Sequence, residues 1–309
     1  KKMSENPIVK KIEELKKEKN AIIMAHYYTT AEVQQVADLL GDSLALSQQA
    51  ASTKADIILF AGVHFMAETA KVLCPDRKVL IPVPEAGCSL AESCPADRFA
   101  RFREKYPDHT VVSYVNTSVE VKALSDICCT SSNALDIVRS IPSDKPVIFG
   151  PDKNLGAYVQ KMTGRRNMVL WDGACHVHEK FSREGIRRMR AKYPDAEVVA
   201  HPECRAEVVE EADFTGSTAA ILSYCGRSAK KSFIVATEVG ILYEMKRRYP
   251  EKEFIPAEVD GGGCGECEYM KMITLENIYT TLRDEKPEIV LDEQVRRKAE
   301  RSIRNMIER

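Results

Sequence analysis

The chain has 309 residues, of which 29% are charged and 44% apolar, as in a globular protein large enough for two or three domains. Its 45 Lys and Arg balance 46 Asp and Glu, so no net field favours nucleic acid or an anionic membrane surface. No apolar run approaches the ~20 residues of a membrane span, and the charged segment 1–20 lacks the apolar core of a signal peptide. We therefore expect a cytoplasmic protein that binds neither nucleic acid nor a membrane.

From the N-terminus onward, the chain reads as three copies of one unit of about 90 residues. Each copy is expected to contain a first strand, a short helix, a second strand, a further helix and a third strand. The first strands are expected at 20–28, 109–117 and 196–204, the short helices at 31–43, 119–132 and 206–218, the second strands at 56–62, 145–151 and 231–237, and the third strands at 78–84, 167–173 and 253–259. In every short helix, an acidic residue followed by Val precedes an Asp by six positions, which fixes the register between copies.

Short strands rich in Ile and Val that alternate with helices are typical of parallel sheets covered on both faces. The helices have apolar residues at helical spacing, for example Val33, Val36, Ala37 and Leu40. We therefore predict an α/β protein of three αβα sandwich domains with short parallel sheets, related by a pseudo-threefold axis that carries the active site.

The expected domains are the three copies, at residues 1–92, 93–179 and 180–273. The tail 274–309 is expected to form a short helix, an extended segment and an amphipathic helix, and to pack on the first copy.

Ten cysteines are many for a chain without a secretion signal, so metal or redox use is a better prediction than disulfides. Cys88, Cys175 and the pair of Cys264 and Cys267 each follow the third strand of a copy. Three thiolates that converge without a fourth are the protein half of an iron–sulfur cluster with one open iron. The C-x-x-C pair alone would also fit half of a zinc site or a redox pair, but the sequence has no second C-x-x-C. Five others are expected to be small buried hydrophobes: Cys74, Cys128, Cys129, Cys204 and Cys225.

Polar side chains occupy nine equivalent positions past the first strands of the three copies. Ligands of parallel sheets bind beyond the carboxyl ends of the strands. The alignment groups His26 with Tyr114 and His201, Tyr28 with Asn116 and Glu203, and Ser43 with Ser131 and Thr218. Contact with solvent explains a single polar residue at a strand end, whereas nine residues in register favour one shared substrate site.

The third group of this alignment is expected to bind anions. Ser43, Ser131 and Thr218 each precede a helical run and are predicted to be N-cap residues. Helix N-termini carry free N–H groups and a positive partial charge, which bind carboxylate or phosphate. Three such termini would hold a polyanionic small molecule.

The other two groups supply acid–base chemistry. His titrates near neutral pH, a Glu in a dry site can have a raised pKa, and a Tyr can donate a proton. His26, His201, Tyr28 and Glu203 are therefore the catalytic candidates. His176 and His178 flank Cys175 and could either support a cluster or simply fill space.

The chain contains a series of motifs that give it a resemblance to a known family. The motifs that carry it are AHYY at Ala25, GDSL at Gly41, FMAE at Phe65, YVNTS at Tyr114, CTSSNA at Cys129, FGPDKNL at Phe149, GACHVH at Gly173, HPEC at His201 and GST at Gly216. Over essentially its full length the chain resembles the quinolinate synthases, the A proteins of de novo NAD biosynthesis. The resemblance implies a transferase that condenses iminoaspartate with dihydroxyacetone phosphate and releases phosphate and water to give quinolinate. It also implies three αβα domains about a pseudo-threefold axis and a [4Fe–4S] cluster with three cysteine ligands and one open iron.

Carried over to this sequence, the resemblance implies the cluster ligands Cys88, Cys175 and Cys267, with Cys264 as a neighbour. It implies that Tyr28 and Glu203 carry protons, and that His26 and His201 bind or polarise substrate. The substrate contacts that it implies are His26, Ser43, Tyr114, Asn116, Ser131, His201, Glu203, Ser217 and Thr218. An aspartate oxidase or dehydrogenase would supply the iminoaspartate.

Two other functions remain open from the residues alone. One is a cluster-dependent hydro-lyase of the aconitase type that acts on a hydroxy acid. The other is a non-enzymatic metal or redox sensor, for which acid–base residues would be dispensable.

Overall fold

The structure is a computed structural model that describes residues 6–309. Residues 1–5, the start of the charged segment 1–20, lie outside the described residues. The chain forms two compact units. The first contains the residues up to 96, residues 115–128 and residues 268–309, and the second contains residues 97–114 and 129–267.

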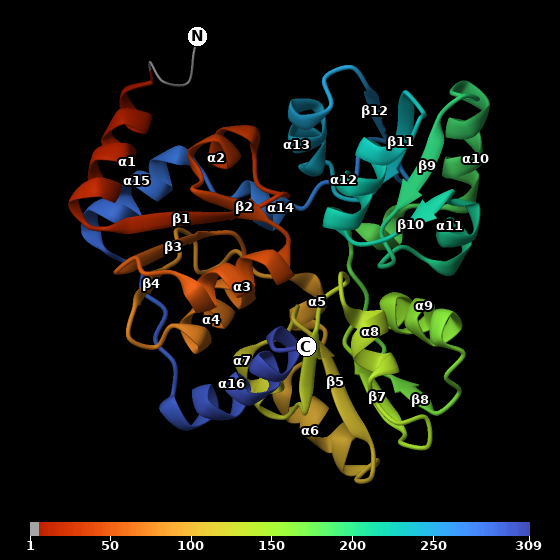
Figure 1. Cartoon of the computed structure of the whole chain (residues 1–309), viewed down its shortest axis with the longest axis horizontal. Helices are drawn as coiled ribbons and strands as arrows, with labels where there is room; N and C mark the ends of the chain where they lie inside the picture. Colours follow the sequence, from red (N-terminus) through yellow and green to blue (C-terminus); the bar gives the residue numbers. More distant parts are fainter. Residues whose placement is uncertain (1–5) are drawn as a thin grey trace. The chain divides into compact units, whose positions relative to one another are not determined.

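Three four-stranded parallel sheets form the framework (Figure 1). The first has the order β2-β1-β3-β4, with β1 (Ala21–His26), β2 (Leu39–Gly41), β3 (Ile57–Ala61) and β4 (Lys78–Leu80). The second has the order β6-β5-β7-β8, with β5 (Thr110–Tyr114), β6 (Ile127–Cys129), β7 (Val147–Gly150) and β8 (Met168–Leu170). The third has the order β10-β9-β11-β12, with β9 (Glu197–Ala200), β10 (Phe214–Thr215), β11 (Ser232–Ala236) and β12 (Glu253–Pro256). One strand order used three times confirms the α/β class and the three αβα repeats.

The helices alternate with these strands along the chain. Around the first sheet they are α1 (Pro7–Glu18), α2 (Ala31–Val36), α3 (Ser43–Ser52), α4 (His64–Leu73) and α5 (Ser89–Glu92). The second repeat has α6 (Ala96–Glu104), α7 (Val119–Ala123), α8 (Ala134–Arg139) and α9 (Lys153–Thr163), and the third has α10 (Arg183–Lys192), α11 (Ala206–Glu211), α12 (Thr218–Arg227) and α13 (Ile241–Arg248). The tail forms α14 (Glu268–Lys271), α15 (Leu275–Asp284) and α16 (Glu293–Ile307).

The sequence-based expectation of three strands for each repeat was wrong, because each sheet has a fourth strand. The predicted short helices end early, at Val36, Ala123 and Glu211, and the edge strands β2, β6 and β10 follow them. These strands have only two or three residues, which is too short for a recognisable alternation of apolar and polar residues. The prediction therefore extended the first of these helices through Ala37 and Leu40, although α2 ends at Val36.

The Asp that ends the repeated spacing has a structural role in the first and third repeats. Asp38 accepts a hydrogen bond from the backbone N of Ile23 at 2.7 Å and donates its own backbone N to the carbonyl of Ile23 at 2.9 Å. Asp213 makes the same pair of bonds with Val198, both at 2.8 Å. Each Asp therefore ties the turn before the edge strand to the central strand.

In the first unit, helices pack on both faces of the sheet. α1 and α15 pack together against β1 and β3, and α3 and α4 pack together against β1 and β4 (Figure 1). α16 packs against α4 and α7. The extended segment before α16 pairs with the sheet, since Ile289 N donates to Val79 O at 2.8 Å. The predicted helix, extended segment and helix of the tail are confirmed, while the domain boundaries remain a prediction.

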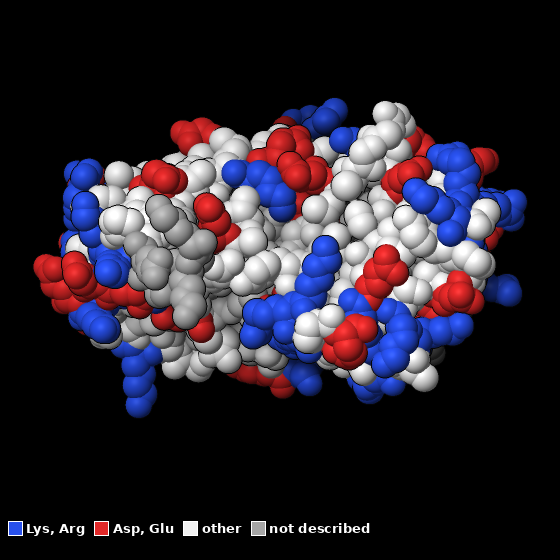
Figure 2. Space-filling model, turned by 90° about the horizontal axis from the view of Figure 1, so that it is seen from above, with Lys and Arg blue, Asp and Glu red and all other residues white. Residues whose placement is uncertain are grey.

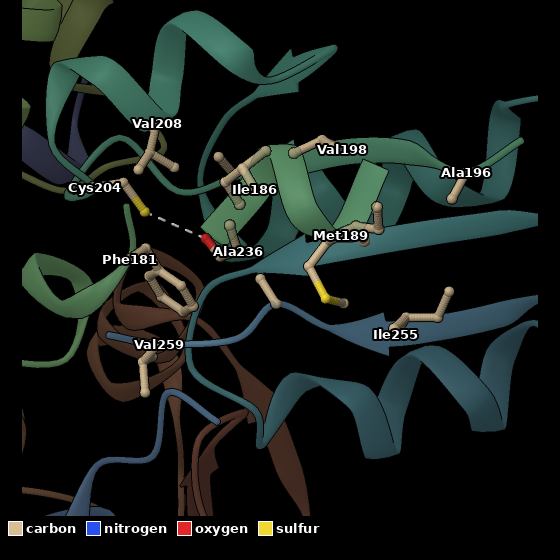
Figure 3. Close-up of a cluster of buried hydrophobic side chains, with 13 residues drawn as sticks. Phe181, Ile186, Met189, Ala196, Val198, Cys204, Val208, Ala236, Ile255 and Val259 are labelled. Atoms are coloured by element: carbon tan, nitrogen blue, oxygen red, sulfur yellow. Dashed lines mark hydrogen bonds between the residues drawn. The ribbon is translucent and has the colours of Figure 1, made fainter. Parts of the chain in front are cut away.

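In the second unit, the core of the third repeat lies between its sheet and the helices α10 and α11 (Figure 3). Ile186 and Met189 of α10 and Val208 of α11 meet Val198 of β9 and Ala236 of β11. The Cys204 thiol donates to the carbonyl of Ala236 at 3.4 Å, so this cysteine is part of the core, as predicted.

Among the residues that the structure describes, no helix is both long and apolar enough to cross a membrane. On the face seen in Figure 2, the side chains of Lys and Arg are interspersed with those of Asp and Glu. The two signs of charge are therefore mixed among the described residues on this face.

Candidate functional site

The cysteines divide into buried and accessible groups, and none is in a disulfide. Cys88 lies after β4 in the first unit, and Cys175 and Cys267 lie after β8 and β12 in the second. These three are partly exposed and Cys264 is exposed, whereas the other six are buried. Burial raises the pKa of two of the buried thiols, Cys94 and Cys225, to about 12. Because thiolates are the form that binds metal, the accessible cysteines are the better ligands.

His178, in a short 3-10 helix (His178–Lys180), connects Cys175 to Glu203 inside the second unit. Its Nδ1 lies 3.2 Å from Cys175 Sγ and 3.0 Å from Glu203 Oε2, and its Nε2 lies 2.8 Å from Thr237 Oγ1. His178 is only 2% exposed and Glu203 only 4%. The ligand atoms of Cys175, His178 and Glu203 lie within 4.8 Å of one another, so this group could hold a metal ion.

Glu203 is the centre of the polar network. The Tyr114 hydroxyl donates a hydrogen bond to its Oε1. Burial alone would raise the pKa of Glu203, but the rings of His201 and His178 and the hydrogen bonds from His178 and Tyr114 outweigh burial and hold that pKa well below its usual value. Glu203 is therefore a carboxylate at neutral pH.

Both ring nitrogens of His201 have a hydrogen-bond partner. Nδ1 accepts a hydrogen bond from the backbone N of Glu203 at 3.1 Å, and Nε2 lies 3.2 Å from Ser131 Oγ. Since Nδ1 accepts, the proton of a neutral ring lies on Nε2 and is donated to Ser131. The second unit thus brings together four predicted site residues, namely Tyr114, Ser131, His201 and Glu203.

Asp152, which the sequence analysis did not single out, is fully buried in the same unit. Its Oδ1 accepts from Leu155 N at 2.7 Å at the start of α9, and its Oδ2 has no hydrogen-bond partner. Burial, and next the negative charge of Glu203, raises the pKa of Asp152 well above its usual value. Two buried carboxyls with opposite shifts are typical of acid–base sites. The signals in the sequence were its place two residues after a strand and its inclusion in the FGPDKNL motif.

The two residues that follow β11 were also missed. Thr237 contacts His178, as described, and Glu238 is 1% exposed. The carboxylate of Glu238 accepts from Cys267 N at 3.0 Å and from Gly240 N at 2.6 Å. This pair therefore holds both the histidine beside Cys175 and the backbone of Cys267.

The first unit holds His26, Tyr28, Ser43 and Asn116. His26 Nδ1 accepts from the backbone N of Tyr28 at 3.1 Å, the bond that His201 and Glu203 also make. The carbonyl of Tyr28 accepts from Lys271 Nζ at 2.5 Å. Asn116 Oδ1 is buried and has no hydrogen-bond partner in the structure, so its acceptor is available to a ligand.

The predicted N-caps were wrong. The actual cap of α3 is Asp42, whose Oδ1 accepts from Ala45 N at 3.0 Å, and that of α12 is Ser217, whose Oγ accepts from Ala220 N at 3.1 Å. Ser43 and Thr218 are the first helical residues, and their backbone N–H groups lie at the open helix end. In the second repeat, the residue before α8 is Asn133, and Ser131 lies two positions earlier. A cap needs an extended backbone next to the first turn, which residue type alone does not reveal.

Comparisons with known proteins agree with these features. A model of the family described as "Quinolinate synthetase A protein" matches residues 10–308. The quinolinate synthase of Thermosynechococcus vestitus is 56% identical over 303 residues, which cover 97% of this chain and 95% of the relative. Those of Microcystis aeruginosa and Synechocystis sp. are 55% identical over 298 residues (96% of this chain, 93% of the relative) and 54% identical over 301 residues (97% and 94%). Together with the three αβα repeats and the buried Cys, His and Glu group, these matches show that the chain is an enzyme of the quinolinate synthetase A protein family.

Proposed function

We propose that this enzyme condenses iminoaspartate with dihydroxyacetone phosphate and releases phosphate and water to form quinolinate. The observation that carries the proposal is the buried network in which Tyr114, Glu203 and His178 connect proton-transfer groups to Cys175. Forming the pyridine ring requires proton removal and the loss of hydroxyl groups, and general acid–base groups beside a Lewis acid suit these steps.

We propose that Cys88, Cys175 and Cys267 hold a [4Fe–4S] cluster with one iron open to substrate. The donor set fits such a cluster, because the three thiols are accessible and each follows the last strand of its sheet. When bound, the cluster supplies a Lewis-acidic iron that binds substrate oxygens and favours dehydration. Cys264 is exposed and forms an isolated antiparallel β-bridge with Glu258, whereas the backbone N of Cys267 donates to the buried carboxylate of Glu238.

The residues of the chain have separate roles in this proposal. Glu203 and Tyr28 carry protons, and His26 and His201 bind or polarise substrate. The open N-terminal turns of α3 and α12 bind carboxylate or phosphate. The substrate contacts proposed are His26, Ser43, Tyr114, Asn116, Ser131, His201, Glu203, Ser217 and Thr218.

Small molecules are the partners of this reaction, and an aspartate oxidase or dehydrogenase is the proposed source of iminoaspartate. We place the reaction in the cytoplasm, where thiols stay reduced. The ten cysteines, none of them in a disulfide, support this location.

The test is to purify the protein without air and to measure iron, sulfide and the visible spectrum, and then to supply iminoaspartate and dihydroxyacetone phosphate. We expect a brown protein with a broad visible absorption band that forms quinolinate. A colourless protein that holds one zinc ion at Cys175, His178 and Glu203 would contradict the cluster. A brown protein that dehydrates a hydroxy acid but forms no quinolinate would favour a hydro-lyase of the aconitase type.

A further inference from the structure

Lys122 of α7 is a buried cation in the first unit that the proposed reaction does not use. It is 0% exposed, although a Lys is rarely buried without strong partners. Its Nζ donates to the carbonyl of Val115 at 2.7 Å and to the carbonyl of Thr117. Its Nζ also lies 5.5 Å from the centre of the Phe65 ring.

The two carbonyls that Lys122 binds belong to the neighbours of Asn116. Thr117 N donates to Val115 O at 2.8 Å, so Asn116 is the central residue of a three-residue turn. Lys122 therefore holds this turn on both sides of Asn116 with one ammonium group. The turn directs an amide whose Oδ1 has no partner within the protein.

Burial and the acidic groups of the unit act on the Lys122 ammonium in opposite directions. Burial lowers the pKa of Lys122, and Cys128, Glu68, Glu120 and Cys88 act in the opposite direction. Glu68 is itself 8% exposed, and its pKa is raised by burial although Lys122 acts to lower it. A Met would fill the same space without an ion to bury, but it would leave the carbonyl of Thr117 without this donor.

We infer that Lys122 is a positioning residue for substrate binding, whose ammonium holds the turn of residues 115–117 so that the Asn116 amide is oriented before substrate arrives. The inference rests on the proposed role of Asn116 as a substrate contact. A preset amide avoids the entropy loss of ordering the turn on binding, which is a gain in affinity rather than in the chemical step.

A double-mutant cycle tests the inference with Lys122→Met, Asn116→Ala and the double variant, all prepared without air. Each single variant is expected to raise the KM about tenfold and to leave kcat unchanged, as for the loss of one hydrogen bond made equally in the ground and transition states. The dissociation constant of quinolinate, measured by calorimetry, is expected to rise in parallel. The double variant should be no weaker than Asn116→Ala alone, because both changes remove one interaction.

Lys16→Met is the matched control, because Lys16 is another buried Lys of this unit. It is 8% exposed, lies 2.8 Å from Asp38 Oδ1 and donates to the carbonyl of Val36 at 3.4 Å. This variant should lower the melting temperature without changing the KM. If Lys122→Met does not fold, Lys122→Gln replaces it in the cycle with the same expected rise in KM, because its side chain is one bond shorter and its neutral amide does not replace an ammonium that donates to both carbonyls.

Two results would overturn the inference. In one, the Lys122 variant lowers the melting temperature and the active fraction but keeps the normal KM, which is a purely structural effect. In the other, the two substitutions weaken binding additively. A normal KM for Asn116→Ala would instead remove the proposed role of Asn116 while quinolinate formation persists, so the two failures are distinguishable.

Discussion

Glu203 and Asp152 are two buried carboxyl groups of one unit whose pKa values move in opposite directions. Both are desolvated, which raises the pKa of an acid. Burial alone would raise the pKa of Glu203, but electrostatic interaction with His201 and His178 lowers that pKa by more. The negative charge of Glu203 instead repels an ionised Asp152, which raises the pKa of Asp152 further. The same carboxyl group can therefore have a lowered pKa in one place and a raised pKa in another.

Replacing Glu203 by Gln should abolish turnover without loss of the cluster. Gln has the same shape but cannot accept a proton, so we expect kcat to fall by about 10²–10⁴-fold. The loss should be constant across the neutral pH range, because the pKa of Glu203 lies well below it. Iron content and spectrum are measured beside turnover, and Glu210→Gln on the exposed side of α11 is the matched control. Unchanged turnover in Glu203→Gln would contradict the role of Glu203 as a proton carrier.

Replacing Asp152 by Asn should change how stability depends on pH. The pKa of Asp152 is raised by folding, so its contribution to stability is fully present below the unfolded value of about 3.9 and is lost as the pH rises toward the folded value. Asn keeps the oxygen that caps α9 but does not titrate. The difference in the free energy of unfolding between Asp152→Asn and the unchanged chain, measured in urea, is therefore expected to shift in favour of the variant as the pH rises above about 4.

The control for this titration is Asp292→Asn, since Asp292 caps α16 through Oδ1 but is exposed. Its difference from the unchanged chain should lack the upward trend. A difference for Asp152→Asn that is the same at every pH would show that folding does not hold a proton on Asp152.

At the scale of elements, each repeat depends on a very short edge strand. β10 has two residues, so its own ladder provides few hydrogen bonds. Asp213 compensates through its two bonds to Val198, and Arg190 Nη2 donates to its carboxylate at 2.9 Å. The turn before the strand, rather than the strand itself, fixes its place at the sheet edge.

Removing this carboxylate should destabilise the third repeat. Asp213→Ala leaves the buried N–H of Val198 without its acceptor, so we expect a loss of about 1–3 kcal/mol in the free energy of unfolding. Urea unfolding followed by circular dichroism measures it. Asp195→Ala, at an exposed position before β9, should change stability by less than about 0.5 kcal/mol. Equal losses in both variants would contradict the role of Asp213.

At the scale of the whole molecule, the proposal is that three repeats serve one cluster. The first and second repeats each place one accessible cysteine after the last strand of the sheet, Cys88 and Cys175, and the third places two, Cys264 and Cys267. If three cysteines share one cluster, replacing any one of them should release the whole cluster. If each cysteine belongs to a separate site, replacing one should empty only that site. Substitution of single cysteines separates these cases.

Cys88→Ser, Cys175→Ser and Cys267→Ser are each expected to lose nearly all iron and the visible band, while Cys264→Ser keeps both. Iron and sulfide analysis of protein purified without air is the measurement. Retention of about two thirds of the iron in each variant would indicate independent sites. Loss of the cluster in Cys264→Ser, with retention in Cys267→Ser, would exchange the proposed ligand.

Much of the fold could be predicted from local sequence patterns. Apolar segments such as 56–62 and 231–237 became β3 and β11, because continuous Ile and Val favour a buried parallel strand. The edge strands could not be predicted, because two or three residues carry no periodicity and are held by a distant partner such as Val198. The N-caps shifted to Asp42 and Ser217 because the cap is a property of backbone conformation.

The sequence by itself determined the three repeats, the order of their elements and the polar residues after their first strands, since these follow from periodicity and register. Only the tertiary structure decided which polar groups meet inside each unit. Tyr114 meets Glu203, and Lys122 holds both sides of Asn116. The pKa of Asp152 is raised because folding buries its carboxyl near the negative charge of Glu203. Hydrogen bonds and pKa shifts depend on burial and on neighbours distant in sequence, and neither is present in the unfolded chain.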